Sequence, residues 1–361
     1  MRNLFLVVVL SLELLGGCQG RSADRRGVEA SLDRGNDLAA KKEYDKAITE
    51  YDEAIRLDPT NPVAYINRGE AHRKKNECDK AIADYNEAMR LEPKLANPYN
   101  NRGEAYRQMK DFGRAIADYN EAMRLDPTLG AAYNNRGEAY RETKEYDRAM
   151  ADYNEAIRLE PNDAVAYSNR GLVWNAKREY DKAIADFGEA VRLDPKNAKA
   201  YSNRGVIWGS KKDYGKAIAD LNDAIRLDPD DAMAYCSRGF VWTAQKEYDK
   251  AIADYNEAIR LDPANANADL ALAWILSTCP TDRFRDGKRA VELATEACEL
   301  RAWKDASGRI FLAAAYAECG DFDSAIKYEN EAIELNPGTA LVKQAKAMLA
   351  LFKDHKPYRQ K

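Results

Sequence analysis

The apolar positions of residues 130–163 follow the spacing of two short helices. The first stripe comprises Tyr133, Gly137 and Tyr140, and the second comprises Ala149, Tyr153 and Ala156. Polar residues 143–145 separate the two stripes. Pro161 ends the second helix because it has no N–H to donate and disfavours helical backbone at the residue before it. The stretch therefore predicts a pair of helices, neither of which could bury its stripe alone.

The same stretch recurs along most of the 361-residue chain at a spacing of 34 residues. Its prolines are Pro59, Pro93, Pro127, Pro161, Pro195, Pro229 and Pro263, and its glycines are Gly35, Gly69, Gly103, Gly137, Gly171, Gly205 and Gly239. A period of this length indicates a repeat architecture, in which stability comes from stacking one unit on the next. The length alone would suggest two or three globular domains, but the unbroken period favours one solenoid.

These residues resemble the signature of the tetratricopeptide repeat family, which places an aromatic, a Gly, a Tyr, an Ala, an aromatic, an Ala and a Pro at fixed offsets. The matching residues are Tyr133, Gly137, Tyr140, Ala149, Tyr153, Ala156 and Pro161. The resemblance implies an all-α fold, a right-handed superhelical solenoid of stacked antiparallel helix pairs. It covers seven repeats in residues 28–265 and returns in residues 306–339, where Tyr316, Ala325, Tyr328, Ala332 and Pro337 are assigned to the signature.

One departure from the family recurs just before the glycine, where the usual leucine is replaced by arginine. These arginines are Arg34, Arg68, Arg102, Arg136, Arg170, Arg204 and Arg238. A row of aspartates recurs with the same period, namely Asp84, Asp118, Asp152, Asp186, Asp220 and Asp254. We expect the two rows to form ion pairs that stabilise the repeats.

The N-terminus has the features of a targeting segment. Residues 1–17 contain an apolar run that is shorter than the ~20 residues a membrane-spanning helix needs. The run ends in the tetrapeptide LGGC, which resembles the lipobox of bacterial lipoproteins and implies cleavage before Cys18 and lipidation of its thiol. Gln19 implies, by the same resemblance, sorting to an outer membrane. Residues 18–27 would then form the lipidated end and a short polar tether. Secretion without a lipid is the alternative.

The C-terminal part departs from the strict period. Residues 266–305 form an atypical helical unit with a longer loop, residues 306–339 a further repeat, and residues 340–361 a helix and tail. The last helix places Leu341, Ala345, Met348, Leu349 and Phe352 on one face. This face is typical of a capping helix, and a basic helix on a membrane surface is the alternative. Cys279 and Cys298 could form a disulfide in an oxidising compartment or remain separate thiols.

Composition and motifs exclude several classes of function. The chain has 56 basic and 60 acidic residues and a net charge of −4, so it lacks the basic excess on which nucleic-acid binding depends. The two histidines, His72 and His355, have no plausible catalytic partner, and no nucleophile elbow, phosphate loop or metal-ligand spacing occurs. We therefore expect no enzymatic activity, no cofactor or metal, and no small-molecule substrate.

By the family resemblance, the first helix of each pair lines a concave groove, and this is where partner-binding residues are expected. A row of amides runs along it, namely Asn67, Asn101, Asn135, Asn169 and Asn203. Side-chain amides can both donate to and accept from the backbone of an extended peptide, which is the family's use of such asparagines. Solvation of a helix surface is the alternative for these residues.

A second row in the groove changes character along the chain. Glu70, Glu104 and Glu138 each precede an arginine by three positions, a spacing that predicts pairs within one helix. The same positions later hold Leu172, Val206 and Phe240. Exposed apolar residues mark contact sites, so these three are the favoured docking site, and packing inside the solenoid is their alternative. Trp174, Trp208 and Trp242, beside them, are assigned to packing between repeats.

The sequence thus predicts a non-enzymatic scaffold in the bacterial cell envelope that binds a partner protein or peptide. The alternative is a structural, self-associating envelope component with no dedicated groove ligand.

Overall fold

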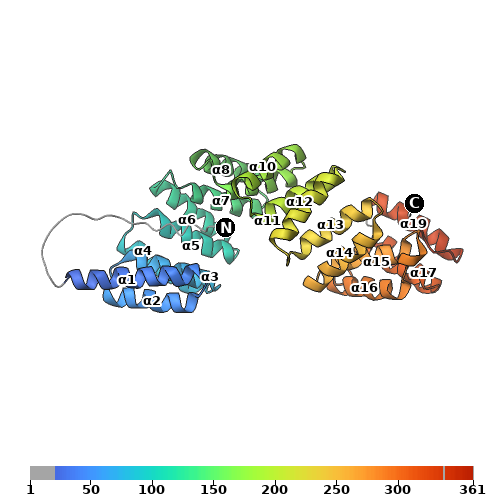
Figure 1. Ribbon diagram of the computed structural model, residues 1–361, viewed down its shortest axis with the longest axis horizontal. Helices are drawn as coiled ribbons and strands as arrows, with labels where there is room; N and C mark the ends of the chain where they lie inside the picture. The colour runs from blue at the N-terminus through green and yellow to red at the C-terminus, as the bar shows by residue number, and fades with distance from the viewer. Residues whose placement is uncertain (1–20, 336–337, 361) are drawn as a thin grey trace. The chain divides into compact units, whose positions relative to one another are not determined.

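The structure is a computed structural model that describes residues 21–335 and 338–360. These residues form nineteen α-helices and one short 3-10 helix, η1 (Asp282–Phe284), and contain no strand (Figure 1). The expected all-α fold is therefore confirmed. The chain divides into two compact units, Met1–Asp194 and Pro195–Lys361, and each is considered by itself.

The helices of both units follow one another as pairs. In the described part of the first unit they are α1 (Arg21–Ala40), α2 (Tyr44–Leu57), α3 (Pro62–Lys74), α4 (Cys78–Leu91), α5 (Ala96–Gln108), α6 (Phe112–Leu125), α7 (Gly130–Glu142), α8 (Tyr146–Leu159), α9 (Ala164–Ala176) and α10 (Tyr180–Leu193). In the second unit they are α11 (Ala198–Ser210), α12 (Tyr214–Leu227), α13 (Ala232–Ala244), α14 (Tyr248–Leu261), α15 (Ala266–Thr278), α16 (Gly287–Leu300), α17 (Ala306–Glu318), α18 (Phe322–Glu334) and α19 (Thr339–Lys353).

The turn inside each pair lies where the polar break was predicted. Between α7 and α8, Lys144 adopts a left-handed backbone with φ 64°, and the N–H of Glu145 donates to the carbonyl of Tyr140 at 2.7 Å. This bond closes the C-terminus of α7 in the way helices commonly end. Residues at the same place in the other repeats share the conformation, namely Lys42, Asn76, Lys110, Arg178, Lys212 and Lys246.

The signature glycine is required because it packs directly against the signature aromatic ring. A Cβ on Gly137 would lie 2.8 Å from Cε1 of Tyr153, a distance at which one of the two groups must move. The aromatic ring is fully buried, so it has no room to move. Glycine therefore lets α7 approach α8 closely enough to cover the ring. The buried position is occupied in successive repeats by Tyr51, Tyr85, Tyr119, Tyr153, Phe187, Leu221 and Tyr255.

The recurring arginines pair with the recurring aspartates, as expected. The pairs with both charges in one repeat are Arg68 with Asp84, Arg102 with Asp118, Arg136 with Asp152, Arg170 with Asp186, Arg204 with Asp220, and Arg238 with Asp254. Each arginine contributes two N–H groups to its aspartate, a geometry that is stronger than a single contact. The departure from the family signature is therefore structural.

The first helices of successive pairs contact one another. In the first unit α1 contacts α3, α3 contacts α5, α5 contacts α7 and α7 contacts α9, and in the second unit α11 contacts α13 in the same way. Extensive contacts between successive second helices do not occur among the described residues. Within each unit the first helices therefore form the inner layer, and the second helices form the outer one.

Two details near the ends of the chain differ from the sequence prediction. α1 begins at Arg21, so residues 21–27 continue a helix rather than forming an extended tether; this stretch contains no proline, and a Cβ on Gly27 would lie 3.1 Å from Leu57. The assignment of Tyr328 to the buried aromatic position was wrong. Glu329 has that place and is 0% exposed, while Tyr328 stacks on Tyr316 at a centroid distance of 5.5 Å.

The C-terminal helix covers the end of the second unit. Ala345, Met348 and Phe352 of α19 are fully buried, and α19 packs against α18, an arrangement that supports its interpretation as a capping helix. Cys279 and Cys298 are buried, separate thiols in the structure, which is the second of the two alternatives stated for them. Within residues 21–335 and 338–360, no helix has the length and apolar character needed to cross a membrane. The predicted lipidation site, Cys18, lies outside the described residues.

Candidate functional site

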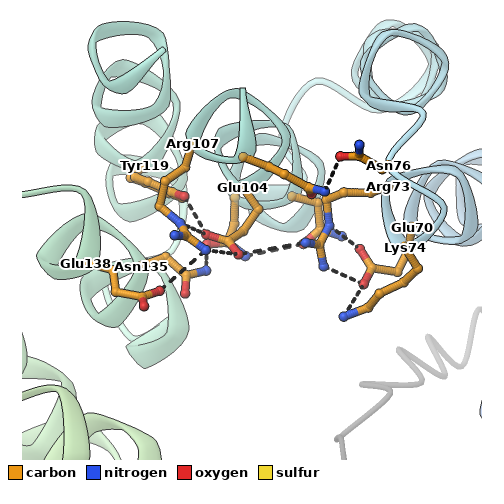
Figure 2. Close-up of polar contacts among 12 residues, drawn as sticks. Glu70, Arg73, Lys74, Asn76, Glu104, Arg107, Tyr119, Asn135 and Glu138 are labelled. Atoms are coloured by element: carbon orange, nitrogen blue, oxygen red, sulfur yellow. Dashed lines mark hydrogen bonds and ion pairs between the residues drawn. The ribbon is translucent and has the colours of Figure 1, made fainter. Parts of the chain in front are cut away.

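The inner layer of the first unit carries an alternating row of acidic and basic side chains, which we call the charge ladder (Figure 2). It begins on α3, where Arg73 donates to both oxygens of Glu70, through Nε at 2.9 Å and through Nη2 at 2.6 Å. Lys74 also approaches Glu70, at 3.5 Å. The pairing within one helix that the spacing predicted is therefore present.

The ladder continues across α5 to α7 through contacts between helices. Glu104 lies 3.9 Å from Arg73 of the preceding repeat and 3.0 Å from Arg107 of its own helix. Arg107 then reaches Glu138 at 3.5 Å and Glu142 at 2.6 Å, both on α7. Figure 2 shows Glu104 lying between the two arginines. Charges of opposite sign are thus linked from one repeat to the next, which the spacing within one helix did not predict.

Glu104 is held by side chains from two successive repeats. Burial tends to raise the pKa of its carboxyl, but the bond from Arg107 and the charges of Arg107 and Arg73 outweigh burial and lower that pKa. The Tyr119 hydroxyl also donates to Glu104 at 2.7 Å. One repeat earlier, Tyr85 donates to Glu70 at 3.3 Å in the same way.

The ladder ends at Arg141 on α7. Its guanidinium lies 3.6 Å from Glu138, and its Nε is buried and has no hydrogen-bond partner. The hydroxyl of Tyr153, which corresponds to that of Tyr119, is also buried without a partner. Arg107 receives carboxylates from Glu138 and Glu142 of α7. The equivalent positions on α9, which would serve Arg141, hold Leu172 and Ala176. The last arginine of the ladder therefore lacks the partners that its predecessor has.

The amide row forms hydrogen bonds of its own. Asn67 donates to Asn36 at 3.1 Å, Asn135 to Asn100 at 3.0 Å, and Asn169 to Asn134 at 3.1 Å, in each case through Nδ2 and to the preceding repeat. Asn101 accepts from Asn100 at 3.3 Å. Asn203 is half-buried on α11. Each donating amide retains its second N–H, so peptide binding by this row stays a prediction.

The predicted apolar positions lie on first helices with differing exposure. Leu172 is partly buried on α9, whereas Val206 on α11 is 40% exposed and Phe240 on α13 is 51% exposed. The ring of Phe240 also meets Tyr255 edge-on at 5.6 Å between centroids. Partner binding at these residues likewise stays a prediction.

Two further exposed apolar residues were missed by the sequence analysis. Val165 on α9 is 54% exposed and Met233 on α13 is 55% exposed. They occupy the same repeat position, in the first turn of a first helix, with Lys199 between them in the series. A comparison of this repeat position, which is not part of the family signature, could have identified both residues from the sequence.

The large aromatic residues beside the row belong to packing, as expected. Trp174 packs against Tyr153 and Val173, and Trp208 packs against Leu221 and Val241 of its own and the next repeat. Lysines cover their outer faces; Lys182 lies 4.5 Å from the Trp174 ring.

A few titratable groups of the described residues lie outside the charge ladder. No cluster of three or more His, Cys, Asp or Glu side chains suited to a metal ion is found among them. His72 contacts Glu77 at 2.7 Å in a turn. Two carboxyls are buried without hydrogen-bond partners, and burial raises their pKa values to about 6 for Asp269 and to about 9 for Glu329.

Family models match most of the chain. A model described as TPR repeat matches residues 35–76, 69–110 and 137–174. Models described as tetratricopeptide repeat match residues 96–129 and 232–265, residues 175–232, and residues 306–339. A search of curated proteins gave no match.

Several solved structures are similar in fold. A tetratricopeptide repeat protein from Parabacteroides merdae is 21% identical with a TM-score of 0.51, over 68% of this chain and 97% of that one. The Cut9 and Hcn1 hetero-tetramer of the APC/C gives 19% identity and a TM-score of 0.63, over 82% of this chain and 59% of that one. PilF from Pseudomonas aeruginosa gives 19% and 0.53, over 57% of this chain and 94% of that one. At these identities the likeness shows the fold alone.

Helix pairs stacked with their first helices in one layer define an α-helical repeat protein, an architecture that typically serves as a non-catalytic scaffold for protein interactions. With the 34-residue signature and the matching models, the chain belongs to the tetratricopeptide repeat family.

Proposed function

We propose that this protein is a non-catalytic scaffold of the bacterial cell envelope that binds a segment of a partner protein along its first helices. The observation that carries the proposal is the location of exposed apolar side chains. Within the regular repeats, large apolar residues that are more than a third exposed and lie inside helices occur on first helices, namely Val165, Val206, Met233 and Phe240.

In the second unit these residues form one surface. α11 contacts α13, and Val206 and Phe240 occupy the same position on the two helices. Met233 lies seven residues before Phe240 on α13, a spacing that returns to the same helix face. Exposed apolar groups held on a rigid inner layer favour contact with the apolar side chains of a partner. We call these three residues the apolar strip.

The binding proposal is tested by cross-linked pull-down from the native cell envelope. The variant carries Val206→Asp, Met233→Asp and Phe240→Asp together. The matched control carries Ala185→Asp, Ala219→Asp and Ala253→Asp, which add the same charge at exposed positions of the second helices. Circular dichroism checks that both variants are folded.

The proposal is supported if a partner is retained by the wild type and the control but lost with the variant of the apolar strip. The identity of that partner then indicates the pathway. Recovery of the same proteins by all three forms, or recovery of this chain only, contradicts the proposal. The second of these results favours a structural, self-associating component.

Anchoring is proposed on the sequence of residues 1–18 and rests on separate grounds. Labelling cells with a radioactive fatty acid should mark the wild type and leave Cys18→Ala unlabelled, and the variant should leave the membrane fraction. An unlabelled wild type would contradict the lipid anchor without affecting the binding proposal.

A further inference from the structure

The charge ladder is complete at Arg107 and incomplete one repeat later. Arg107 contacts three carboxylates, those of Glu104, Glu138 and Glu142. The last two come from α7, the first helix of the next repeat. Arg141 occupies the same position on α7, and among the described residues Glu138, at 3.6 Å, is the one carboxylate that it contacts. The side chain of Arg141 remains 28% exposed, so its unfilled side can be reached from outside the protein.

The missing partners can be identified from the repeat itself. Position 172 corresponds to Glu138 and position 176 to Glu142, and they hold leucine and alanine. Glu138 cannot fully replace them, because it is shared between two arginines, with one oxygen 3.5 Å from Arg107 and the other 3.6 Å from Arg141. As a result the Nε of Arg141 is a buried donor without an acceptor, and the hydroxyl of Tyr153, which is 0% exposed and lies beside Arg141, has no carboxylate to donate to. Leaving such groups unpaired costs free energy, part of which Glu138 could recover by turning toward them once another acid neutralises Arg141.

We propose that Arg141 binds a carboxylate of the partner protein, which supplies the rung missing from the ladder. The proposal rests on the proposed function and names the chemistry of the partner at one point of the same face. A carboxylate is favoured over other acceptors because the equivalent guanidinium, Arg107, already holds carboxylates in this place, and arginine binds them through a matching fork of N–H groups.

The neighbouring side chain specifies what accompanies the acid. Leu172 stands on α9 where Glu138 stands on α7, and it is only partly buried. A partner segment with its carboxylate at Arg141 would place an adjacent residue over Leu172. The expected partner motif is therefore an aspartate or glutamate next to an apolar residue. The ligand carboxylate would first contact the exposed Nη groups, and Glu138 could then turn toward the hydroxyl of Tyr153, as Glu104 does toward Tyr119.

The experiment uses the full mature chain and a phage library of random 12-residue peptides. Peptides are selected on the wild type, on Arg141→Met and on Arg192→Met, whose arginine is exposed on the second helix α10 and serves as the control. The best peptide from the wild type is then synthesised in its acidic form and with the acid replaced by its amide, and binding is measured by calorimetry.

The expected result is enrichment of an acidic residue beside an apolar one on the wild type and on Arg192→Met, and loss of the acidic preference on Arg141→Met. Replacing the acid by its amide should weaken binding to the wild type about tenfold or more, and should have little effect with Arg141→Met.

A second pair of variants keeps the test independent of any folding defect in Arg141→Met. Leu172→Glu should supply the missing carboxylate internally and exclude the acidic peptide, whereas Leu172→Gln, with the same shape and no charge, should bind it more tightly than Leu172→Glu. Equal binding by the two variants overturns the proposal.

The remaining outcomes separate the two proposals. Peptides that bind the wild type without an acidic preference overturn the role of Arg141 and leave the scaffold function standing. If no selected peptide binds at the apolar strip or at the charge ladder, both proposals are overturned.

Discussion

Arg136 binds Asp152 through two parallel hydrogen bonds, Nε to Oδ2 at 2.8 Å and Nη2 to Oδ1 at 2.6 Å. Its third nitrogen, Nη1, donates to Asn120 of the preceding repeat at 2.6 Å. One side chain thus joins the two helices of its own repeat and the repeat before it. The leucine usual in the family could pack at this position, but it could not neutralise the buried aspartate.

Arg136→Leu should therefore be destabilising, although it restores the family's usual residue. Asp152 is 4% exposed and would be left buried without its cation, so we expect a loss of about 3 kcal/mol. The measurement is the denaturant midpoint, together with hydrogen exchange of α7 and α8. The double variant with Asp152→Leu should recover much of the loss. A single variant as stable as the wild type would show that the pair contributes little.

The contact of Gly137 with Tyr153 gives a second prediction. Gly137→Ala should destabilise the array by roughly 1–3 kcal/mol, since the new methyl group overlaps a buried ring. Gly215→Ala is the control, because a Cβ there meets nothing within 4 Å and alanine favours the helix. Thermal unfolding should rank Gly215→Ala at or above the wild type and Gly137→Ala below it. The reverse order would contradict the packing argument.

The regular part of the fold could be predicted because local signals repeat. Equivalents of Pro161 and of the break at 143–145 recur in each regular repeat, with helical stripes between them. The helix boundaries assigned in one repeat therefore apply to the others. The atypical C-terminal units lacked this support. There Tyr328 was assigned to the buried position because it is aromatic, whereas Glu329, one residue later, is the buried residue. The four-residue spacing from Ala325, equal to that of Tyr153 from Ala149, was the signal in the sequence that could have found it.

The candidate site could be predicted only in part, because its chemistry depends on contacts between repeats. The pair of Glu104 with Arg107 follows from the spacing on one helix, but the contacts of Glu104 with Arg73 and of Arg107 with Glu142 need the distance between helices. The replacement of Glu138 by Leu172 was visible in the sequence. Its consequence, an arginine and a tyrosine without acceptors, required the structure.

The central position of Glu104 in the charge ladder predicts a large effect of its charge. Glu104→Gln should destabilise the array by about 3 kcal/mol, because Arg107 and Arg73 lose a carboxylate that is largely shielded from solvent. The lowered pKa of Glu104 means that its stabilisation is present above its ordinary value of 4.5 and is lost as the pH falls through the folded-state pKa. The variant should therefore lose less stability on acidification than the wild type does.

The control for Glu104 is Glu121→Gln, which removes an acid from the exposed pair with Arg124 on α6. Pairs of this kind contribute little, so the change should stay within about 0.5 kcal/mol. Urea titrations at pH 4 and pH 7 give both comparisons. Equal effects of the two substitutions would mean that the ladder is no more than a solvated row of charges.

The buried carboxyl of Glu329 predicts that stability changes with pH in the opposite direction, falling as the pH rises. Burial raises the pKa of its carboxyl from the ordinary 4.5 to about 9, so the folded protein keeps a proton that the unfolded chain releases. Because the folded state then binds more protons, the free energy of unfolding should fall as pH rises from about 5 to 9, by up to about 1.4 kcal/mol per pH unit. Glu329→Gln, which cannot titrate, should remove this slope, and Glu329→Leu should also stabilise the second unit at pH 8. The measurement is the denaturant midpoint of the three forms between pH 5 and pH 9. Parallel curves for all three would show that the carboxyl is ionised in the folded protein, with a partner or a solvent path that its burial does not indicate.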